Sequence, residues 1–236
     1  GCLTRRPQRF GATTQMNDTL LQSLERPAAG TPTPWLLVLM HGVGSNEQDL
    51  FGLTPYVPPH FHVLSLRAPF VLGPGSYAWF EFDVRPDGSR AIDGEQELAS
   101  REALTREIAA HAERLGVSPE RVLVGGFSQG GIMGLSLLLT QPSLMHGAFA
   151  LHSRLLPEVL TLAAPAADLA GKALWVSHGL QDMVIPLAQA QRIREHFGAL
   201  PVTLDGADFP GGHELRPAEL QQWIGWLNRT TSKETT

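Results

Sequence analysis

The sequence from residue 122 to residue 131 is VLVGGFSQGG, an apolar run that leads into the motif Gly126-Phe127-Ser128-Gln129-Gly130. The residues that follow, up to Thr140, are small and apolar, as in a helix that is buried on all sides. A strand that turns sharply into a helix at G-x-S-x-G exposes its serine, and the flanking glycines lack the Cβ atoms that would collide there. The stretch therefore predicts a strand, a strained turn at Ser128 and a buried helix.

A phosphate-binding turn is the alternative interpretation of this glycine-rich motif. The chain contains no G-x-x-x-x-G-K-[ST] sequence, and no lysine lies near Ser128. A serine at a helix N-terminus has another use, because the free N–H groups there stabilise a developing oxyanion. Ser128 is therefore a candidate nucleophile.

Short apolar runs and helical patterns alternate along the rest of the chain. The runs have the length of strands, and several are apolar without interruption, as in strands buried on both faces. The predicted strands cover residues 35–40, 61–66, 122–124, 148–151, 173–176 and 202–204, and the predicted helices cover 98–115, 130–140, 186–197 and 220–227. This alternation predicts an α/β fold with a mostly parallel central sheet and helices on both faces. Residues 69–96, rich in Gly and Pro, are predicted as the longest loop.

The composition limits the classes of function. A length of 236 residues suits one domain, expected over residues 17–236 after a flexible leader or extension at 1–16. The net charge of −5 offers no basic surface for nucleic acid, and no apolar run is long enough to span a bilayer. The single cysteine, Cys2, excludes an internal disulfide. We expect a cytoplasmic protein, with lipid anchoring through Cys2 as the minor alternative.

Two candidate partners of Ser128 follow it in the chain, each just past a predicted strand. Asp182 comes after the strand 173–176, and His213 comes after the strand 202–204, in the sequence Phe209-Pro210-Gly211-Gly212-His213. A serine nucleophile needs a base, and the base needs an orienting carboxylate; hydrolases with this turn carry them in the order Ser, Asp, His. The active-site loops of parallel sheets also follow the carboxyl ends of the strands. Order and position together predict a triad of Ser128, Asp182 and His213.

Other histidines compete for a role in the site. His178 is the nearest rival to His213 as the base, but it precedes the carboxylate in the chain. His152 ends a predicted strand and is a candidate for lining the site. Asp182 on its own is compatible with an ordinary turn aspartate, so its assignment depends on Ser128 and His213.

A second strand end, Met40-His41-Gly42-Val43-Gly44, is a candidate oxyanion loop. Glycines at a strand end let the backbone approach a ligand closely. Hydrolases of this type take one oxyanion donor from such a loop and one from the residue after the nucleophile. We therefore expect the N–H groups of Val43 and Gln129 to be the donors. On its own, the loop also fits a tight strand-to-helix turn.

These motifs, together with Trp79-Phe80, His178-Gly179 and Gly212-His213, resemble the phospholipase/carboxylesterase family of α/β-hydrolases, which includes small bacterial carboxylesterases and acyl-protein thioesterases. The resemblance covers about residues 33 to 228 in order. It implies a compact α/β-hydrolase fold without a large cap domain and an enzyme that needs no metal or cofactor. One departure is that His152-Ser153 stands where such enzymes usually have a Ser-Gly pair.

The expected activity is that of a serine carboxylesterase acting on small or medium acyl chains through an acyl-enzyme. The alternatives are an acyl-protein thioesterase, a lysophospholipase or, from another class, a non-catalytic binding protein on the same scaffold. The substrate pocket is expected near Trp79, Phe80, His152 and Phe209. Trp79 and Phe80 fit a pocket wall and a loop anchor equally well. We expect a small-molecule ester or thioester as the partner and no nucleic acid, and leave a homodimer open.

Overall fold

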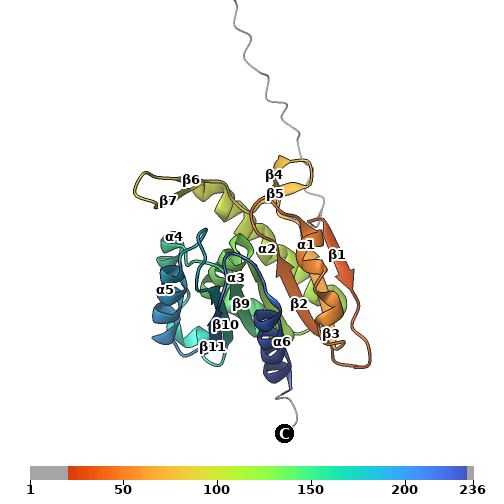
Figure 1. Cartoon of the computed structure of the whole chain (residues 1–236). Coiled ribbons are helices and arrows are strands. Elements are labelled where there is room, and N and C mark those ends of the chain that lie inside the picture. The colour runs from red at the N-terminus through yellow and green to blue at the C-terminus, as the bar shows by residue number, and fades with distance from the viewer. Residues whose placement is uncertain (1–20, 233–236) are drawn as a thin grey trace, which may run out of the picture.

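The computed structural model describes residues 21–232, which are arranged around one central sheet (Figure 1). The predicted leader at 1–16 and Cys2 lie outside the described residues. The sheet has seven strands in the order β1-β3-β2-β8-β9-β10-β11, and β1 alone runs antiparallel, against β3 at one edge. Its strands are β1 (Ser23–Arg26), β2 (Trp35–Met40), β3 (Phe61–Leu66), β8 (Val122–Phe127), β9 (Gly147–Leu151), β10 (Ala173–Gly179) and β11 (Thr203–Phe209).

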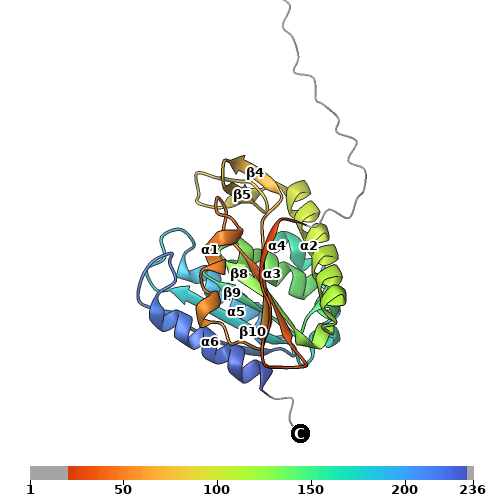
Figure 2. The same cartoon turned by 90° about the vertical axis from the view of Figure 1, so that its right-hand side faces the viewer.

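Helices cover both faces of this sheet (Figure 2). Helices α2, α3 and α5 pack on one face, and α1 and α6 pack on the other. The helices are α1 (Glu47–Phe51), α2 (Gly94–Leu115), α3 (Gln129–Thr140), α4 (Pro157–Leu160), α5 (Leu187–Gly198) and α6 (Pro217–Thr231), with short 3₁₀ turns η1 (Thr54–Tyr56), η2 (Pro119–Arg121), η3 (Pro142–Leu144) and η4 (Ala166–Leu169). The predicted fold class is confirmed. No helix within residues 21–232 combines the length and the apolar character needed to cross a membrane.

The uninterrupted apolar strands are explained by burial on both faces. In β2, every residue is buried, and alternate side chains enter different cores. Leu36, Val38 and Met40 join the core beneath α2 and α3, whereas Trp35, Leu37 and Leu39 join the core beneath α6. A strand with only one buried face would show polar residues at every second position.

Two expectations for irregular segments were wrong. The predicted loop at 69–96 contains two antiparallel hairpins, β4 (Phe70–Gly73) with β5 (Ser76–Ala78), and β6 (Phe82–Val84) with β7 (Arg90–Ile92). Strand β1 was not anticipated either. These strands are only three or four residues long and, apart from Ala78, exposed or half-buried, so none carries an apolar run as long as those of the buried strands.

The centre of the sheet is organised by the close approach of β8 and α3 to β2. A Cβ atom on Gly126 would lie 1.9 Å from the carbonyl oxygen of Met40, and a Cβ on Gly130 would lie 1.8 Å from the same oxygen. Both distances are far below contact, and the obstacle is backbone, which cannot rotate away. The steric role predicted for these two glycines is confirmed.

We predict that Gly126→Ala destabilises the fold by about 3 kcal/mol or more, because the added methyl forces β8 away from β2. The matched control is Gly198→Ala at the end of α5, where a Cβ meets nothing within 4 Å; its effect should stay within about 1 kcal/mol. Urea denaturation measures both. Equal stability of the two variants would contradict the packing described for Gly126.

Candidate active site

Ser128 stands at the turn between β8 and α3 in a conformation that L-residues rarely adopt, with φ 54° and ψ −116°. Its N–H donates to the carbonyl oxygen of Leu151 at the end of β9 (2.8 Å), and its own carbonyl oxygen accepts from Ile132 in α3 (3.1 Å). A side chain held this way stands at the start of a helix and beyond the end of the sheet. Backbone strain of this kind persists only where the surroundings fix it, and it is concentrated at functional sites.

Asp182 occupies the loop after β10, and its carboxylate accepts four hydrogen bonds. Oδ1 accepts from the N–H groups of Val184 (2.9 Å) and Ile185 (2.8 Å). Oδ2 pairs with Nδ1 of His213 (2.7 Å) and Nδ1 of His152 (3.0 Å). Burial favours the protonated acid, but these hydrogen bonds outweigh it and hold the pKa of Asp182 below its ordinary value. The carboxylate is therefore an anion at neutral pH.

His213 follows β11 and is the more accessible partner of Asp182, with 18% of its side chain exposed. Its ring packs on Phe127, the residue before Ser128, with centroids 4.8 Å apart. Because Nδ1 is directed at the carboxylate, the ring carries its hydrogen there and presents Nε2 as the basic atom. Among the described residues no hydrogen bond joins Ser128 Oγ to this ring, as in many ligand-free hydrolases, where that contact forms on substrate binding.

The loops that carry Asp182 and His213 are tied to each other. The N–H of Leu180 donates to the carbonyl oxygen of Phe209 (2.8 Å), and the N–H of Gln181 donates to that of Gly211 (2.9 Å). A third hydrogen bond runs from the N–H of Gly211 to the side-chain oxygen of Gln181 (2.6 Å). Phe209, a predicted pocket residue, is the last residue of β11. Its side chain is buried, and its carbonyl oxygen takes part in the first of these hydrogen bonds.

The candidate oxyanion loop lies directly against the Ser128 turn. A Cβ on Gly42 would lie 3.5 Å from Cβ of Ser128, so the two segments are in van der Waals contact. Within residues 21–232, the N–H groups of Val43 and Gln129 donate to no backbone carbonyl in a turn or loop. Gln129 is the first residue of α3, whose first turn has no intrahelical acceptors. Both N–H groups are therefore available near the serine.

Trp79 and Phe80, the other predicted pocket residues, are fully buried and pinned to the oxyanion loop and to α3. Trp79 Nε1 donates to the carbonyl oxygen of His41 (2.9 Å). The Gln129 side chain accepts from the N–H of Trp79 (2.7 Å) and donates to the carbonyl oxygen of Phe80 (2.7 Å). These contacts favour the anchoring interpretation over the pocket-wall interpretation.

His152 is buried between two carboxylates. Its Nδ1 pairs with Asp182 and its Nε2 with Glu219 Oε1 (2.8 Å). Burial opposes the charged ring, but both carboxylates favour it more strongly and raise the pKa of His152 above its ordinary value. His152 therefore acts as a cation within the core rather than as an apolar pocket wall. Its backbone also has a positive φ, 53°.

Glu219 in α6 is the member of this network that the sequence did not reveal. Its Oε2 accepts from Ser177 Oγ (2.6 Å), which in turn accepts from Trp175 Nε1 (3.0 Å). An acid in the first turn of an amphipathic helix is an ordinary capping residue by pattern, so only the fold shows that it points inward. The available signal was the departure at His152-Ser153 from the usual Ser-Gly pair, which places an ionisable ring where the family has a small residue.

His178, the rival base, is fully buried and stacked on His152. Its Nε2 donates to the carbonyl oxygen of Ile185 (2.7 Å), and burial lowers its pKa. Because Nε2 is bonded to Ile185, it is not available to accept a proton from Ser128. The ring instead stabilises the loop that carries Asp182.

His152, Asp182 and His213 also offer ligand atoms within 4.8 Å of one another, a spacing that could hold a metal ion. Both Nδ1 atoms, however, are at hydrogen-bond distance from the same oxygen, and a metal would have to displace both protons. The hydrogen bonds account for the cluster without an ion.

Comparison with known proteins identifies the family. The family model for phospholipase/carboxylesterase matches residues 27–231. The chain belongs to this family. Membership makes it a hydrolase of ester bonds, as the motifs indicated.

Two relatives and one solved structure each cover three quarters or more of this chain. Acyl-protein thioesterase 1 of Kluyveromyces lactis is 25% identical over 225 residues, covering 89% of this chain and 97% of that protein. Acyl-protein thioesterase 1 of Neurospora crassa is 26% identical over 187 residues, covering 75% and 74%. The carboxylesterase of Bacillus cereus superposes with a TM-score of 0.78 at 22% identity, covering 90% of this chain and 96% of that one.

We predict that Trp79→Ala lowers the free energy of unfolding by about 3–5 kcal/mol, since it removes a fully buried indole and its bond to His41. Denaturation measures the loss, and hydrolysis of a series of ester chain lengths measures specificity. Anchoring predicts an unchanged order of chain-length preference. A changed preference at wild-type stability would support the pocket wall instead.

We predict a pH-dependent contribution of His152 to stability. Because its folded pKa lies above the unfolded value of 6.5, the stabilisation is complete below pH 6.5 and is lost as the pH rises through the folded pKa. The Asp182 contribution is lost only in acid, as the pH falls through a lowered pKa. The stability advantage of wild type over His152→Asn, which tolerates a positive φ, should therefore shrink as the pH rises above about 6.5. Urea denaturation at each pH measures the free energies of unfolding, and a difference between the two proteins that does not change with pH would contradict this prediction.

Proposed function

We propose that the chain is a serine carboxylesterase in which Ser128 is the nucleophile, His213 the general base and Asp182 the carboxylate that orients the base. The observation that carries this proposal is the 2.7 Å pair between His213 Nδ1 and Asp182 Oδ2 beside the strained Ser128 turn. It supports the tautomer that a serine hydrolase needs, with Nε2 free to accept a proton. The family supplies the reaction class.

In the first half of the reaction, Ser128 Oγ attacks the ester carbonyl carbon while His213 Nε2 takes the hydroxyl proton. The N–H groups of Val43 and Gln129 donate to the oxyanion, aided by the positive end of α3. Asp182 stabilises the imidazolium without taking its proton. Collapse of the intermediate breaks the bond to the alcohol oxygen, which leaves with the proton from Nε2.

In the second half, water attacks the acyl-enzyme and His213 Nε2 takes its proton. The same two N–H groups hold the second oxyanion. Collapse releases the acid, and the proton returns to Ser128 Oγ. Loss of one such oxyanion donor costs about 3 kcal/mol in the barrier, so the fixed position of the Gly42 loop against Ser128 is part of the mechanism.

Thioester hydrolysis is the second candidate, favoured by the acyl-protein thioesterases among the relatives. The same groups serve it, because a thiolate leaves with less need of the proton from His213. Lysophospholipase action is a further form of the same chemistry. Charged side chains near Asp182, among them Arg90 and Arg154, favour small or medium acyl groups over long alkyl chains.

We predict that Ser128→Ala and His213→Ala each lower kcat for a short-chain p-nitrophenyl ester by about 10⁴-fold or more, because the triad acts as a unit. The matched control is Ser118→Ala, an exposed serine ahead of η2, which should keep wild-type kinetics. Circular dichroism verifies the fold of each variant. Wild-type turnover in Ser128→Ala would eliminate the proposed nucleophile, and inactivity of the wild type on every ester and thioester would favour the binding-protein alternative.

A further inference from the structure

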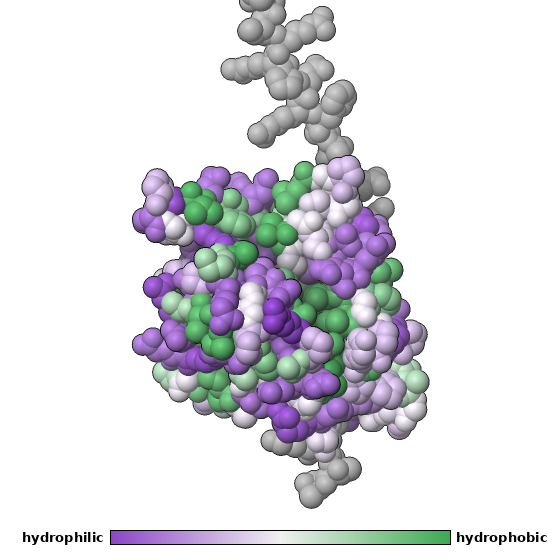
Figure 3. Space-filling view, in the orientation of Figure 1, coloured by the Kyte–Doolittle hydropathy of each residue, from purple (hydrophilic) through white to green (hydrophobic). Residues whose placement is uncertain are grey.

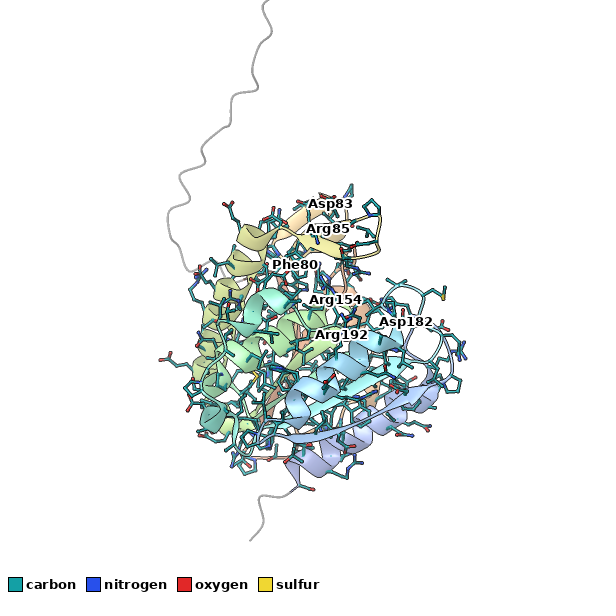
Figure 4. The ribbon with its side chains drawn as sticks, turned by 90° about the vertical axis from the view of Figure 1, so that its left-hand side faces the viewer. Phe80, Asp83, Arg85, Arg154, Asp182 and Arg192 are labelled. Atoms are coloured by element: carbon teal, nitrogen blue, oxygen red, sulfur yellow. The ribbon has the colours of Figure 1, made fainter. Side chains whose placement is uncertain are left out.

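A groove of about 1120 Å³ opens beside the triad loops, between the β6–β7 hairpin and the α4–α5 side of the molecule. Its walls include Val184 and Ile185, whose N–H groups bind the Asp182 carboxylate. Four arginines line it: Arg85, Arg90, Arg154 and Arg192. Figure 4 shows Arg154 between Arg85 on the hairpin and Arg192 on α5, with Asp182 to one side.

Charge in this groove changes from its rim to its interior. The acids that line it, Asp87, Glu158 and Glu195, are all exposed. The charged residues that are half-buried there are Arg90 and Arg154. Rim charges are screened by solvent, whereas half-buried charges are not, so the interior of the groove is cationic. In Figure 3 the left-hand side of the molecule, where the hairpin and α5 lie, shows hydrophilic and hydrophobic surface side by side.

Arg154 is distinguished by donors without partners. Its Nε and Nη2 atoms are buried and have no hydrogen-bond partner among the described residues. Other half-buried arginines are paired: Arg67 with Glu47, Arg101 with Glu97 and Arg194 with Asp208. Buried donors without acceptors are costly and uncommon in native proteins. Both atoms are closed off from solvent, so an acceptor brought by a ligand would satisfy them once the Arg154 side chain turns toward the groove.

Arg90 supplies a second cation beside the first. Its Nη2 donates to the carbonyl oxygen of Val184 (2.8 Å), and its guanidinium lies over the ring of Phe82, 4.7 Å from the centroid. These contacts fix the group next to the Asp182 loop. Burial and the charge of Arg90 both lower the pKa of Arg154. The charge of Glu158 favours the charged form of Arg154, but Glu158 is exposed.

The groove is also connected to the nucleophile through the chain. Ser153, the residue before Arg154, donates its hydroxyl to the carbonyl oxygen of Ser128 (2.8 Å). The segment after β9 therefore holds the Ser128 turn with one residue and lines the groove with the next. Ser128 and His213 do not themselves line the groove, but the residues directly after Asp182 do, so a substrate bound at Ser128 reaches these arginines by extending past the Asp182 loop.

We propose that Arg154, with Arg90, forms a subsite for a carboxylate on the substrate, so that the enzyme prefers esters that carry a negative charge. This inference rests on the proposed function of Ser128. A guanidinium binds a carboxylate through two parallel N–H donors, and the Nε and Nη2 atoms of Arg154 form one such fork. The neighbouring Arg90 adds charge without competing for the fork.

The test compares charged and neutral esters of similar size. Monoethyl succinate against ethyl pentanoate places the charge on the acyl side, and butyryloxyacetate against propyl butyrate places it on the alcohol side. In wild type, the charged ester of one pair should have a kcat/KM about 10- to 100-fold higher than that of its neutral counterpart, as expected for a charge-assisted hydrogen-bonded pair. Arg154→Met should abolish that ratio, and Arg154→Lys should retain part of it.

The matched control is Arg106→Met, an exposed arginine of α2 outside the groove, which should keep the wild-type ratio. Succinate as a competitive inhibitor gives a second readout, with a Ki that rises at least tenfold in Arg154→Met. Equal ratios in wild type and Arg154→Met, for both pairs, would overturn the subsite while leaving neutral-ester hydrolysis by Ser128 intact. Absence of hydrolysis of all four esters by wild type would instead refute the proposed function.

Discussion

The site depends on one steric constraint, the contact of the Met40 carbonyl oxygen with Gly126 and Gly130. Only residues without a Cβ let β8 and α3 approach β2 so closely. That approach turns the chain at Ser128 into its strained conformation and brings the Gly42 loop against the same residue. The geometry of the serine and the position of the oxyanion donors thus follow from a single packing arrangement at the middle of the sheet.

The Asp182 carboxylate is the second point on which the site depends. Two backbone N–H groups and two imidazoles fix it, and one of those rings, His152, is held by Glu219 from the opposite layer of the molecule. The buried charges alternate in sign from Asp182 through His152 to Glu219, which offsets much of the cost of removing them from water. A protonated His152 shares Oδ2 with His213, so the carboxylate that orients the base is itself oriented by α6.

Sequence patterns predicted the five interior strands of the sheet because both of their faces are buried and their residues are mostly apolar. Both edge strands are only partly buried, and of these the start of β11 was anticipated and β1 was not. The patterns also predicted the turn at Ser128, because its glycines have a local steric cause. The role of Glu219 could not be predicted, since an acid at a helix start has a local explanation that conceals a contact with His152, 67 residues away. Arg154 gave no signal for the same reason: an unpaired guanidinium is recognised only when its surroundings are known. The hairpins in 69–96 have strands of only three or four residues, too short for a clear pattern.

The central claim is that Ser128 forms the covalent intermediate. Labelling the full chain with a fluorophosphonate, followed by protease digestion and mass spectrometry, tests it most directly, because the reagent needs both an activated serine and an oxyanion hole. We predict a single adduct on the peptide that contains Ser128, absent from Ser128→Ala and strongly slowed in His213→Ala. An adduct on another residue, or none in a preparation that hydrolyses esters, would contradict it.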